Sequence, residues 1–179
     1  MNLTVVTSNP HKASEIAAFF GGALEINHVD LDLPEHRSDD IGKIAEGKAQ
    51  FAYEELHTPL IVDDTGFIID ALKGFPGPYA AYVLKTLGNE GILKLLEGIE
   101  DRNARFITVI AFADDSGSRV FRGIIDGKIT MNPRGANGFG YDPIFEYKGR
   151  TLAEMPLSEK SRISHRAGAL TAFRDWFIR

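Results

Sequence analysis

The sequence predicts an α/β domain with a mixed β-sheet. Helical and strand patterns alternate over roughly the first 60 residues, which is typical of strands joined by helices. Two long strand patterns joined by a tight turn come later, and a helical pattern closes the chain. The antiparallel pair implied by that turn makes the predicted sheet mixed.

The first three predicted elements are a strand, a helix and a second strand. Residues 3–7 form a β-branched run typical of a buried strand. Pro10 suits the first turn of a helix, which the glycine pair at positions 21–22 ends. Residues 24–29 alternate between apolar and polar side chains, as a strand does.

The middle of the chain is predicted to be mainly helical. Apolar residues at helical spacing predict a helix over 41–56, and Pro59 precedes a strand at 60–62. Residues 79–87 and 91–96 have the pattern of two short helices.

A hairpin and a long helix are predicted for the C-terminal part. Residues 104–113 and 119–125 have the pattern of strands, and Asp114-Asp115-Ser116-Gly117 between them is a good turn sequence. A final helix is expected from about residue 158 to 177, with apolar side chains along one stripe.

Composition limits the class of protein. The 179 residues are 44% hydrophobic and 25% charged, which fits a single globular domain over 1–179. The net charge of −5 argues against a protein that coats nucleic acid or an anionic membrane, and the absence of cysteine excludes disulfides and thiolate sites. No apolar run is long enough to cross a bilayer, and no basic leader is visible. A cytoplasmic enzyme fits these observations.

The first segment with chemical potential is Thr7-Ser8-Asn9-Pro10-His11-Lys12, where a strand end leads into a helix start. Backbone N–H groups and the helix dipole favour an anion there, and the polar side chains and Lys12 add donors and positive charge. The segment lacks the glycines of a P-loop. An alternative is that Ser8 or Asn9 only caps the helix while Lys12 lies in solvent.

The second segment is Val62-Asp63-Asp64-Thr65-Gly66, in which two carboxylates follow an apolar strand. The carboxyl end of a strand is a common ligand site, and Mg²⁺ pairs one or two carboxylates with substrate phosphates. A plain acidic turn is the alternative. Glu35 is a further acidic candidate, whereas Asp39-Asp40 is expected to start the next helix.

Two glycine-rich segments have different interpretations. Gly74-Phe75-Pro76-Gly77-Pro78-Tyr79 is expected to be a structural turn. In the segment from Pro133 to Pro143, glycines allow close approach to a ligand, and Phe139 and Tyr141 offer faces on which a base could stack. Strand alternation would put both rings on one side, and a pair of core aromatics is the alternative.

The last segment is Glu159-Lys160-Ser161-Arg162-Ile163-Ser164-His165-Arg166 on the final predicted helix. Lys160, Ser164, His165 and Arg166 could present several donors near one helix end, although a solvated helix face explains them equally well. A phosphate cradle, a carboxylate metal site, aromatic faces and a basic cluster together indicate a nucleotide hydrolase or transferase.

Taken together, the segments resemble the inosine triphosphate pyrophosphatase family of non-canonical purine NTP pyrophosphatases. They occur in the family's order and cover nearly the whole chain. The matching residues are Thr7-Ser8-Asn9-Pro10-His11-Lys12, Asp32-Leu33-Pro34-Glu35, Val62-Asp63-Asp64-Thr65-Gly66, Gly74-Phe75-Pro76-Gly77-Pro78-Tyr79, Gly138-Phe139-Gly140-Tyr141-Asp142-Pro143-Ile144-Phe145, Ala153-Glu154-Met155 and Ser164-His165-Arg166.

The resemblance implies two lobes around a central cleft, with a long curved mixed sheet and flanking helices. It implies a homodimer and a divalent metal, Mg²⁺ with Mn²⁺ as a substitute. By position, Asp64 resembles the family's catalytic acidic residue and metal ligand, and Glu35 its second metal carboxylate; Asp63 is a further candidate for the metal site. The residues that resemble the family's substrate contacts are Thr7, Ser8, Asn9, Pro10, His11, Lys12, Lys48, Thr65, Phe139, Gly140, Tyr141, Asp142, Lys160, His165 and Arg166.

The expected reaction is hydrolysis of ITP, dITP or XTP to the monophosphate and pyrophosphate, with attack of a metal-activated water on the α-phosphorus. Donors aimed at the 6-oxo group of the base would exclude ATP. Two alternatives stay open: a pyrophosphatase for pyrimidine nucleotides on a related fold, and a nucleotide-binding module without catalysis. Neither nucleic acid nor membrane is an expected partner.

Overall fold

The structure is a computed structural model that describes residues 2–35 and 37–178. Its centre is one eight-stranded sheet in the order β2-β1-β3-β5-β6-β7-β8, with β4 paired to β3. The strands are β1 (Asn2–Val6), β2 (Glu25–Val29), β3 (Leu60–Ile69), β4 (Pro76–Gly77), β5 (Asn103–Asp114), β6 (Gly117–Ile129), β7 (Phe145–Tyr147) and β8 (Arg150–Thr151). β2, β1 and β3 are parallel and the other pairs antiparallel, so the predicted mixed α/β fold is confirmed.

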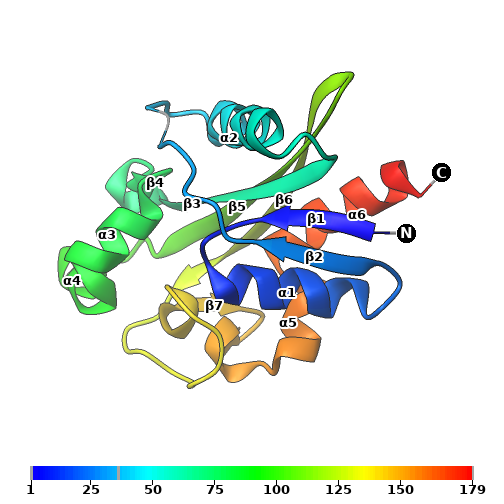
Figure 1. The fold of residues 1–179 in the computed structure, drawn as a ribbon. Coiled ribbons are helices and arrows are strands. Elements are labelled where there is room, and N and C mark those ends of the chain that lie inside the picture. Colours follow the sequence, from blue (N-terminus) through cyan, green and yellow to red (C-terminus); the bar gives the residue numbers. More distant parts are fainter. Residues whose placement is uncertain (1, 36, 179) are drawn as a thin grey trace.

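Helices cover both faces of the sheet (Figure 1). They are α1 (Pro10–Phe20), α2 (Ile41–Leu56), α3 (Ala80–Thr86), α4 (Gly88–Leu95), α5 (Leu157–Ile163) and α6 (His165–Phe177). Three short 3₁₀ turns, Asp70–Leu72, Asp142–Ile144 and Leu152–Glu154, join strands and helices. None of the described helices is long and apolar enough to cross a bilayer.

The hydrophobic core is divided in the way that a two-lobed fold requires. One cluster lies between the sheet and α1 and α6, with Ile16, Ile61 and Phe173 among its members. A second lies on the opposite face under α2, with Ala49 and Val62. A third cluster, at the other end of β3 and β5, packs α3 and α4 against the segment after β6. The site described below lies between these parts.

The hairpin predicted at 114–117 is confirmed, because Asp114 pairs with Gly117 across β5 and β6. Two other expectations are wrong in detail. β3 continues to Ile69, so the acidic segment lies within a strand and not after one. The final helix is broken at Ser164, which has an extended backbone (ψ 165°) and caps α6 by accepting a hydrogen bond from the Ala167 N–H.

Candidate active site

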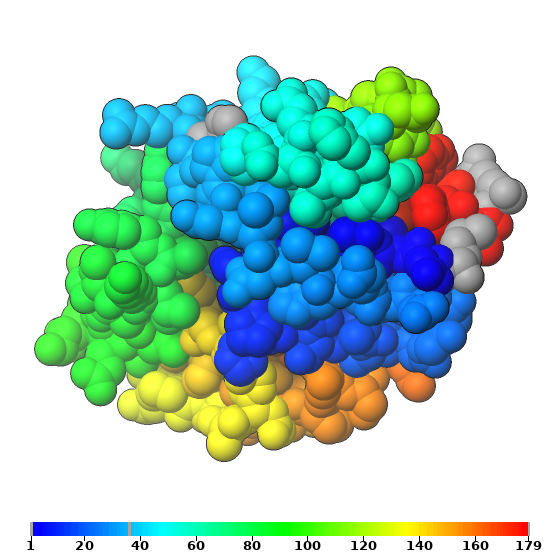
Figure 2. Space-filling model, viewed as in Figure 1, coloured from blue at the N-terminus to red at the C-terminus, as the bar shows by residue number. Residues whose placement is uncertain are grey.

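A pocket of about 170 Å³ lies between α1, the start of α3 and the loop that precedes Asp142–Ile144. Figure 2 shows the hollow on this face, between the green surface of α3 and α4 and the blue surface of the N-terminal segment. Most of the residues predicted to bind substrate or metal line it. These are Asn9, Lys12, Glu35, Lys48, Asp64, Thr65, Phe139, Gly140, Tyr141, Asp142, Lys160, His165 and Arg166.

The two adjacent carboxylates do not face the same way. Successive side chains of a strand point to opposite faces, so Asp63 lies on the α1 and α6 face and Asp64 on the α2 face. The Asp63 side chain has no exposed area and bonds Lys12 (2.6 Å) and Arg166 (2.7 Å). It does not line the pocket, and the suggestion that it binds a metal together with Asp64 does not fit this geometry.

Asp64 forms a small charge cluster with Lys48 and Glu35. The Lys48 Nζ lies 3.5 Å from Asp64 Oδ1 and 3.1 Å from Glu35 Oε2, between the two carboxylates. Burial raises the pKa of Asp64, and the charges of Asp63 and Glu35 add to this although Lys12 and Lys48 oppose it. The site therefore places two carboxylates, Glu35 and Asp64, around the Lys48 ammonium. A second cation near them would be favourable, because the two carboxylates carry more negative charge than Lys48 neutralises.

These residues fit a divalent metal that is completed by substrate. The described residues hold no group of three His, Asp or Glu side chains that could bind an ion alone. Mg²⁺ is usually held by one or two carboxylates together with substrate phosphates. Glu35 and Asp64 supply such a pair.

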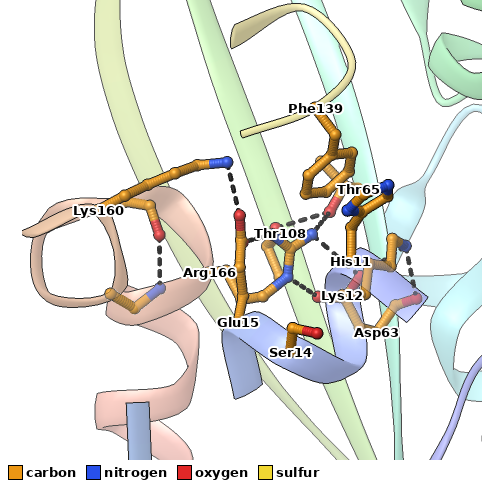
Figure 3. Close-up of polar contacts among 12 residues, drawn as sticks. His11, Lys12, Ser14, Glu15, Asp63, Thr65, Thr108, Phe139, Lys160 and Arg166 are labelled. Atoms are coloured by element: carbon orange, nitrogen blue, oxygen red, sulfur yellow. Dashed lines mark hydrogen bonds and ion pairs between the residues drawn. The ribbon is translucent and has the colours of Figure 1, made fainter. Parts of the chain in front are cut away.

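A network of buried charges links α1, β3, α5 and α6 (Figure 3). The Arg166 guanidinium, on α6, donates to Asp63 on β3 and to Glu15 on α1. Glu15 also lies 2.5 Å from Lys160 Nζ. Burial opposes charge on Asp63, but Arg166 and Lys12 outweigh it and hold the pKa of Asp63 well below its usual range. The network fixes Lys12, Lys160 and Arg166 relative to one another.

At the start of α1 the capping interpretation is correct for Asn9. Its side-chain oxygen accepts from the N–H groups of His11 (2.9 Å) and Lys12 (3.4 Å), and its own N–H donates to Thr7 Oγ1. Three backbone donors proposed for an anion are thus already paired in this structure. Thr7, Ser8, Pro10 and His11 are outside the lining of the pocket, whereas Asn9 and Lys12 are part of it.

The opposite end of the pocket carries the aromatic and basic groups. Phe139 is half-buried, and its N–H donates to Asp142 Oδ2 (2.8 Å). Tyr141 is instead a core residue that donates to the Ala80 carbonyl and stacks on Phe67. The expectation that both rings project from one side of a strand is wrong, because this segment is a turn in which Gly138 and Gly140 have positive φ.

Lys160 and His165 are buried polar groups at this end. The Lys160 ammonium lies 2.5 Å from Asp142 Oδ2 and 4.7 Å from the centroid of the Phe139 ring. The His165 ring stacks on Phe106, and its Nδ1 has no hydrogen-bond partner among the described residues. Burial lowers the pKa of His165 well below its usual value, and the charges of Arg166 and Lys160 add to this, so the ring is neutral. A neutral imidazole both donates and accepts a hydrogen bond.

Sequence reasoning missed Glu15 and Thr108. Glu15 joins Lys160 to Arg166, and the hydroxyl of the fully buried Thr108 lies 2.7 Å from that of Thr65, which lines the pocket. A signal for Glu15 was available, because Lys12, Glu15 and Ile16 follow the spacing of one helix face. A carboxylate on a face that is otherwise buried needs a cationic partner.

The chain is similar to proteins of one known family over nearly its whole length. The model of the Ham1 family matches residues 3–176. The chain belongs to the Ham1 family. A relative from Methanopyrus kandleri named dITP/XTP pyrophosphatase is 51% identical over 170 residues, covering 93% of this chain and 89% of the relative. One from Emericella nidulans, named inosine triphosphate pyrophosphatase, is 39% identical and covers 98% of this chain and 96% of its own.

Solved Ham1 structures have the same fold. The Ham1 protein of Coxiella burnetii matches with a TM-score of 0.87 at 31% identity, covering 99% of this chain and 98% of that one. The Ham1 protein of Staphylococcus aureus matches with a TM-score of 0.86 at 29% identity and the same coverage. The sheet and its flanking helices therefore form a Ham1 fold.

Proposed function

We propose that the chain hydrolyses non-canonical purine nucleoside triphosphates, ITP, dITP and XTP, to the monophosphate and pyrophosphate, and so removes them from the nucleotide pool. Its relatives in the Ham1 family carry the names of this activity. One observation carries the proposal for this chain: a single pocket joins the Asp64–Lys48–Glu35 cluster to Phe139, Lys160 and His165. Phosphate chemistry and base recognition thus share one cavity.

Glu35 and Asp64 are the residues that would hold the divalent metal, Mg²⁺ or Mn²⁺. When bound, the metal supplies positive charge to the triphosphate and polarises water. Asp64 accepts the proton of the attacking water. The water oxygen forms a bond to the α-phosphorus, and the bond to the bridging oxygen of the leaving pyrophosphate breaks. Lys12 and Lys48 stabilise the negative charge that develops on this leaving group.

Base selectivity follows from hydrogen-bond donors at the other end. An ammonium has three donors, and Glu15 and Asp142 take two of those of Lys160. The third donor, together with the neutral His165 ring, meets the 6-oxo group of hypoxanthine or xanthine. Adenine presents an amino donor there, and such a mismatch is rejected by roughly 10⁴-fold in sites built on hydrogen bonds.

A substrate panel with product identification tests the proposal. ITP, dITP and XTP are expected to release pyrophosphate, with ATP and UTP far slower, and chelation of divalent ions should stop turnover until Mg²⁺ is restored. Release of orthophosphate would place attack at the γ-phosphorus, and preference for UTP would favour a pyrimidine enzyme. Binding of ITP without turnover would favour a binding module. The homodimer and the cytoplasmic location stay predictions.

A further inference from the structure

His11 covers one face of the Phe139 ring. It is the second residue of α1, exposed to solvent, and its imidazole stacks on Phe139 with centroids 5.1 Å apart and planes inclined by 13° (Figure 3). Among the described residues no other aromatic ring contacts Phe139. The contact connects the helix that begins at the phosphate end to the loop that carries the base-side aromatic.

The Phe139 ring is a wall between two cavities. On one side is the pocket of about 170 Å³ described above. On the other is a hollow of about 180 Å³ lined by His11, Glu15, Met155 and others. Phe139 lies between Gly138 (φ 71°) and Gly140 (φ 67°), at the end of an exposed stretch without helix or strand. The ring therefore has space behind it and a permissive backbone. The Lys160 Nζ and Arg166 Cζ atoms lie 4.7 Å and 5.9 Å from its centroid, and the His11 stack is its one contact with another aromatic ring among the described residues.

We propose that His11 is a positioning residue that holds the Phe139 ring against the pocket, so that the base of the substrate stacks on a wall that is already in place. The inference rests on the proposed function. His11 acts through Phe139 and outside the pocket lining, which separates it from the direct phosphate contact expected from its place in the Thr7–Lys12 segment. The two roles make different predictions for a ligand that has phosphates but no base.

His11→Ala is expected to raise KM for ITP about 3- to 10-fold, the range given by one aromatic pair. kcat should be unchanged, because the reacting phosphorus lies at the other end of the nucleotide. The inhibition constant of inorganic tripolyphosphate should also be unchanged. His11→Phe, which keeps the stack and removes the hydrogen-bonding nitrogens, should restore KM. His57→Asn is the matched control, since His57 is an exposed histidine at the C-cap of α2.

Equal weakening of ITP and tripolyphosphate binding would show that His11 contacts phosphate, and the proposal would fall. The proposal would also fall if His11→Phe raised KM for ITP as much as His11→Ala does, or if His11→Ala had no effect on KM. In a double-mutant cycle, His11→Ala should have no further effect on KM once Phe139 is replaced by Leu.

One readout does not need turnover. Hydrogen exchange at the Phe139 amide, which donates to Asp142, should be faster in His11→Ala and return to the original rate in His11→Phe. If the chain released no pyrophosphate from any triphosphate, the proposed function would fail while this measurement still decided the role of His11. An unchanged rate of hydrogen exchange at the Phe139 amide in His11→Ala would overturn the proposal that His11 positions Phe139.

Discussion

Asp63 and Asp64 are adjacent residues with the same side chain, but they have different roles because successive side chains of a strand point to opposite faces of the sheet. Asp63 points into the buried charge network and holds Lys12 and Arg166. Asp64 points to the α2 face, where it meets Lys48 at the pocket. One carboxylate fixes the cations, and the other faces the pocket.

Replacing Asp64 with Asn tests the assignment of the base and metal ligand. Asp64→Asn is expected to lower kcat for ITP by about 10²–10⁴-fold, the usual contribution of a general base. The fold should survive because the amide is the same size. The measurement is steady-state pyrophosphate release, with thermal unfolding followed by circular dichroism. Asp115→Asn, in the exposed hairpin turn, is the control. A near-normal kcat would remove Asp64 from the mechanism.

Replacing His165 with Phe tests base recognition. The variant keeps the stack on Phe106 but loses both ring nitrogens. A lost hydrogen bond costs about 1–3 kcal/mol, so kcat/KM for ITP should fall roughly 5- to 150-fold while the slow turnover of ATP does not fall. The ratio of the rates at which ITP and ATP are hydrolysed in a competition assay measures this change in selectivity. Equal loss on both would mean that His165 does not read the base.

The sequence predicts single residues best where the local pattern carries the information. Asp40 was expected to begin a helix, and its side chain does cap α2 at Gly42 N–H (2.8 Å). The roles of Asp63 and Glu15 depend on Arg166, which is 103 and 151 residues away in the chain. Such pairings follow from how α6 packs against the sheet, which local spacing does not encode.

At the scale of elements, the placement of α6 on β6 decides where His165 and Arg166 lie. The backbone of α6 approaches the strand at Gly123, where an added Cβ would lie 2.0 Å from the His165 carbonyl oxygen and 2.3 Å from Ala169 N. Glycine is required there by close approach of two backbones and not by its dihedral angles. The start of α6, which carries His165 and Arg166, therefore packs against β6 at a residue that has no side chain.

Gly123→Ala should move α6 away from the sheet. We expect a loss of about 1–3 kcal/mol in the free energy of unfolding from overpacking, and up to about 10²-fold in kcat/KM, because small displacements of positioning residues are costly. Urea denaturation and ITP turnover measure the two effects. Gly168→Ala is the matched control, since its Cβ would meet Gly123 Cα at 3.4 Å, an ordinary contact, and alanine favours the helix. Equal effects of both variants would contradict the packing argument.

The elements themselves were largely predictable, and the two errors have physical causes. β3 was expected to end at Val62, where the apolar run stops and two adjacent carboxylates follow. It continues because Asp63 is neutralised by Arg166 and Lys12, and because all of β3 from Leu60 to Ile69 pairs with β5. The apolar residues at helical spacing continue on both sides of Ser164, so the periodicity of the sequence did not reveal the break at this residue.

For the whole molecule, the buried charges join α1, β3, α5 and α6 into one unit. Lys12 lies at the proposed phosphate end and Lys160 at the proposed base end, and Glu15, Asp63 and Arg166 connect them. A buried pair contributes little by itself, but removing one partner leaves an uncompensated charge and costs about 3–5 kcal/mol. The same contacts that orient the site therefore make the stability of the fold depend on pH.

Asp63 is the group whose titration shows this dependence. Its pKa is held well below the ordinary value of 3.8, so in the folded chain it stays ionised at pH values where the unfolded chain takes up a proton. Its stabilising contribution is fully present above about pH 4 and is lost as the pH falls further. Asp142 acts in the opposite sense, because burial raises its pKa. Its ionisation opposes folding at higher pH, and this offsets part of the stabilisation that Asp63 contributes there.

Asp63→Asn is therefore expected to lower the free energy of unfolding by about 3–5 kcal/mol at pH 7, with the difference from the unsubstituted chain shrinking as the pH falls below about 4. The substituted side chain cannot titrate, whereas the original carboxylate loses its advantage once protons compete for it. Urea denaturation at a series of pH values gives the comparison, and Asp115→Asn controls for the loss of one negative charge. A difference that stays constant into strong acid would show that Asp63 is not the group that couples this network to pH, and that the stability of the linked helices has another origin.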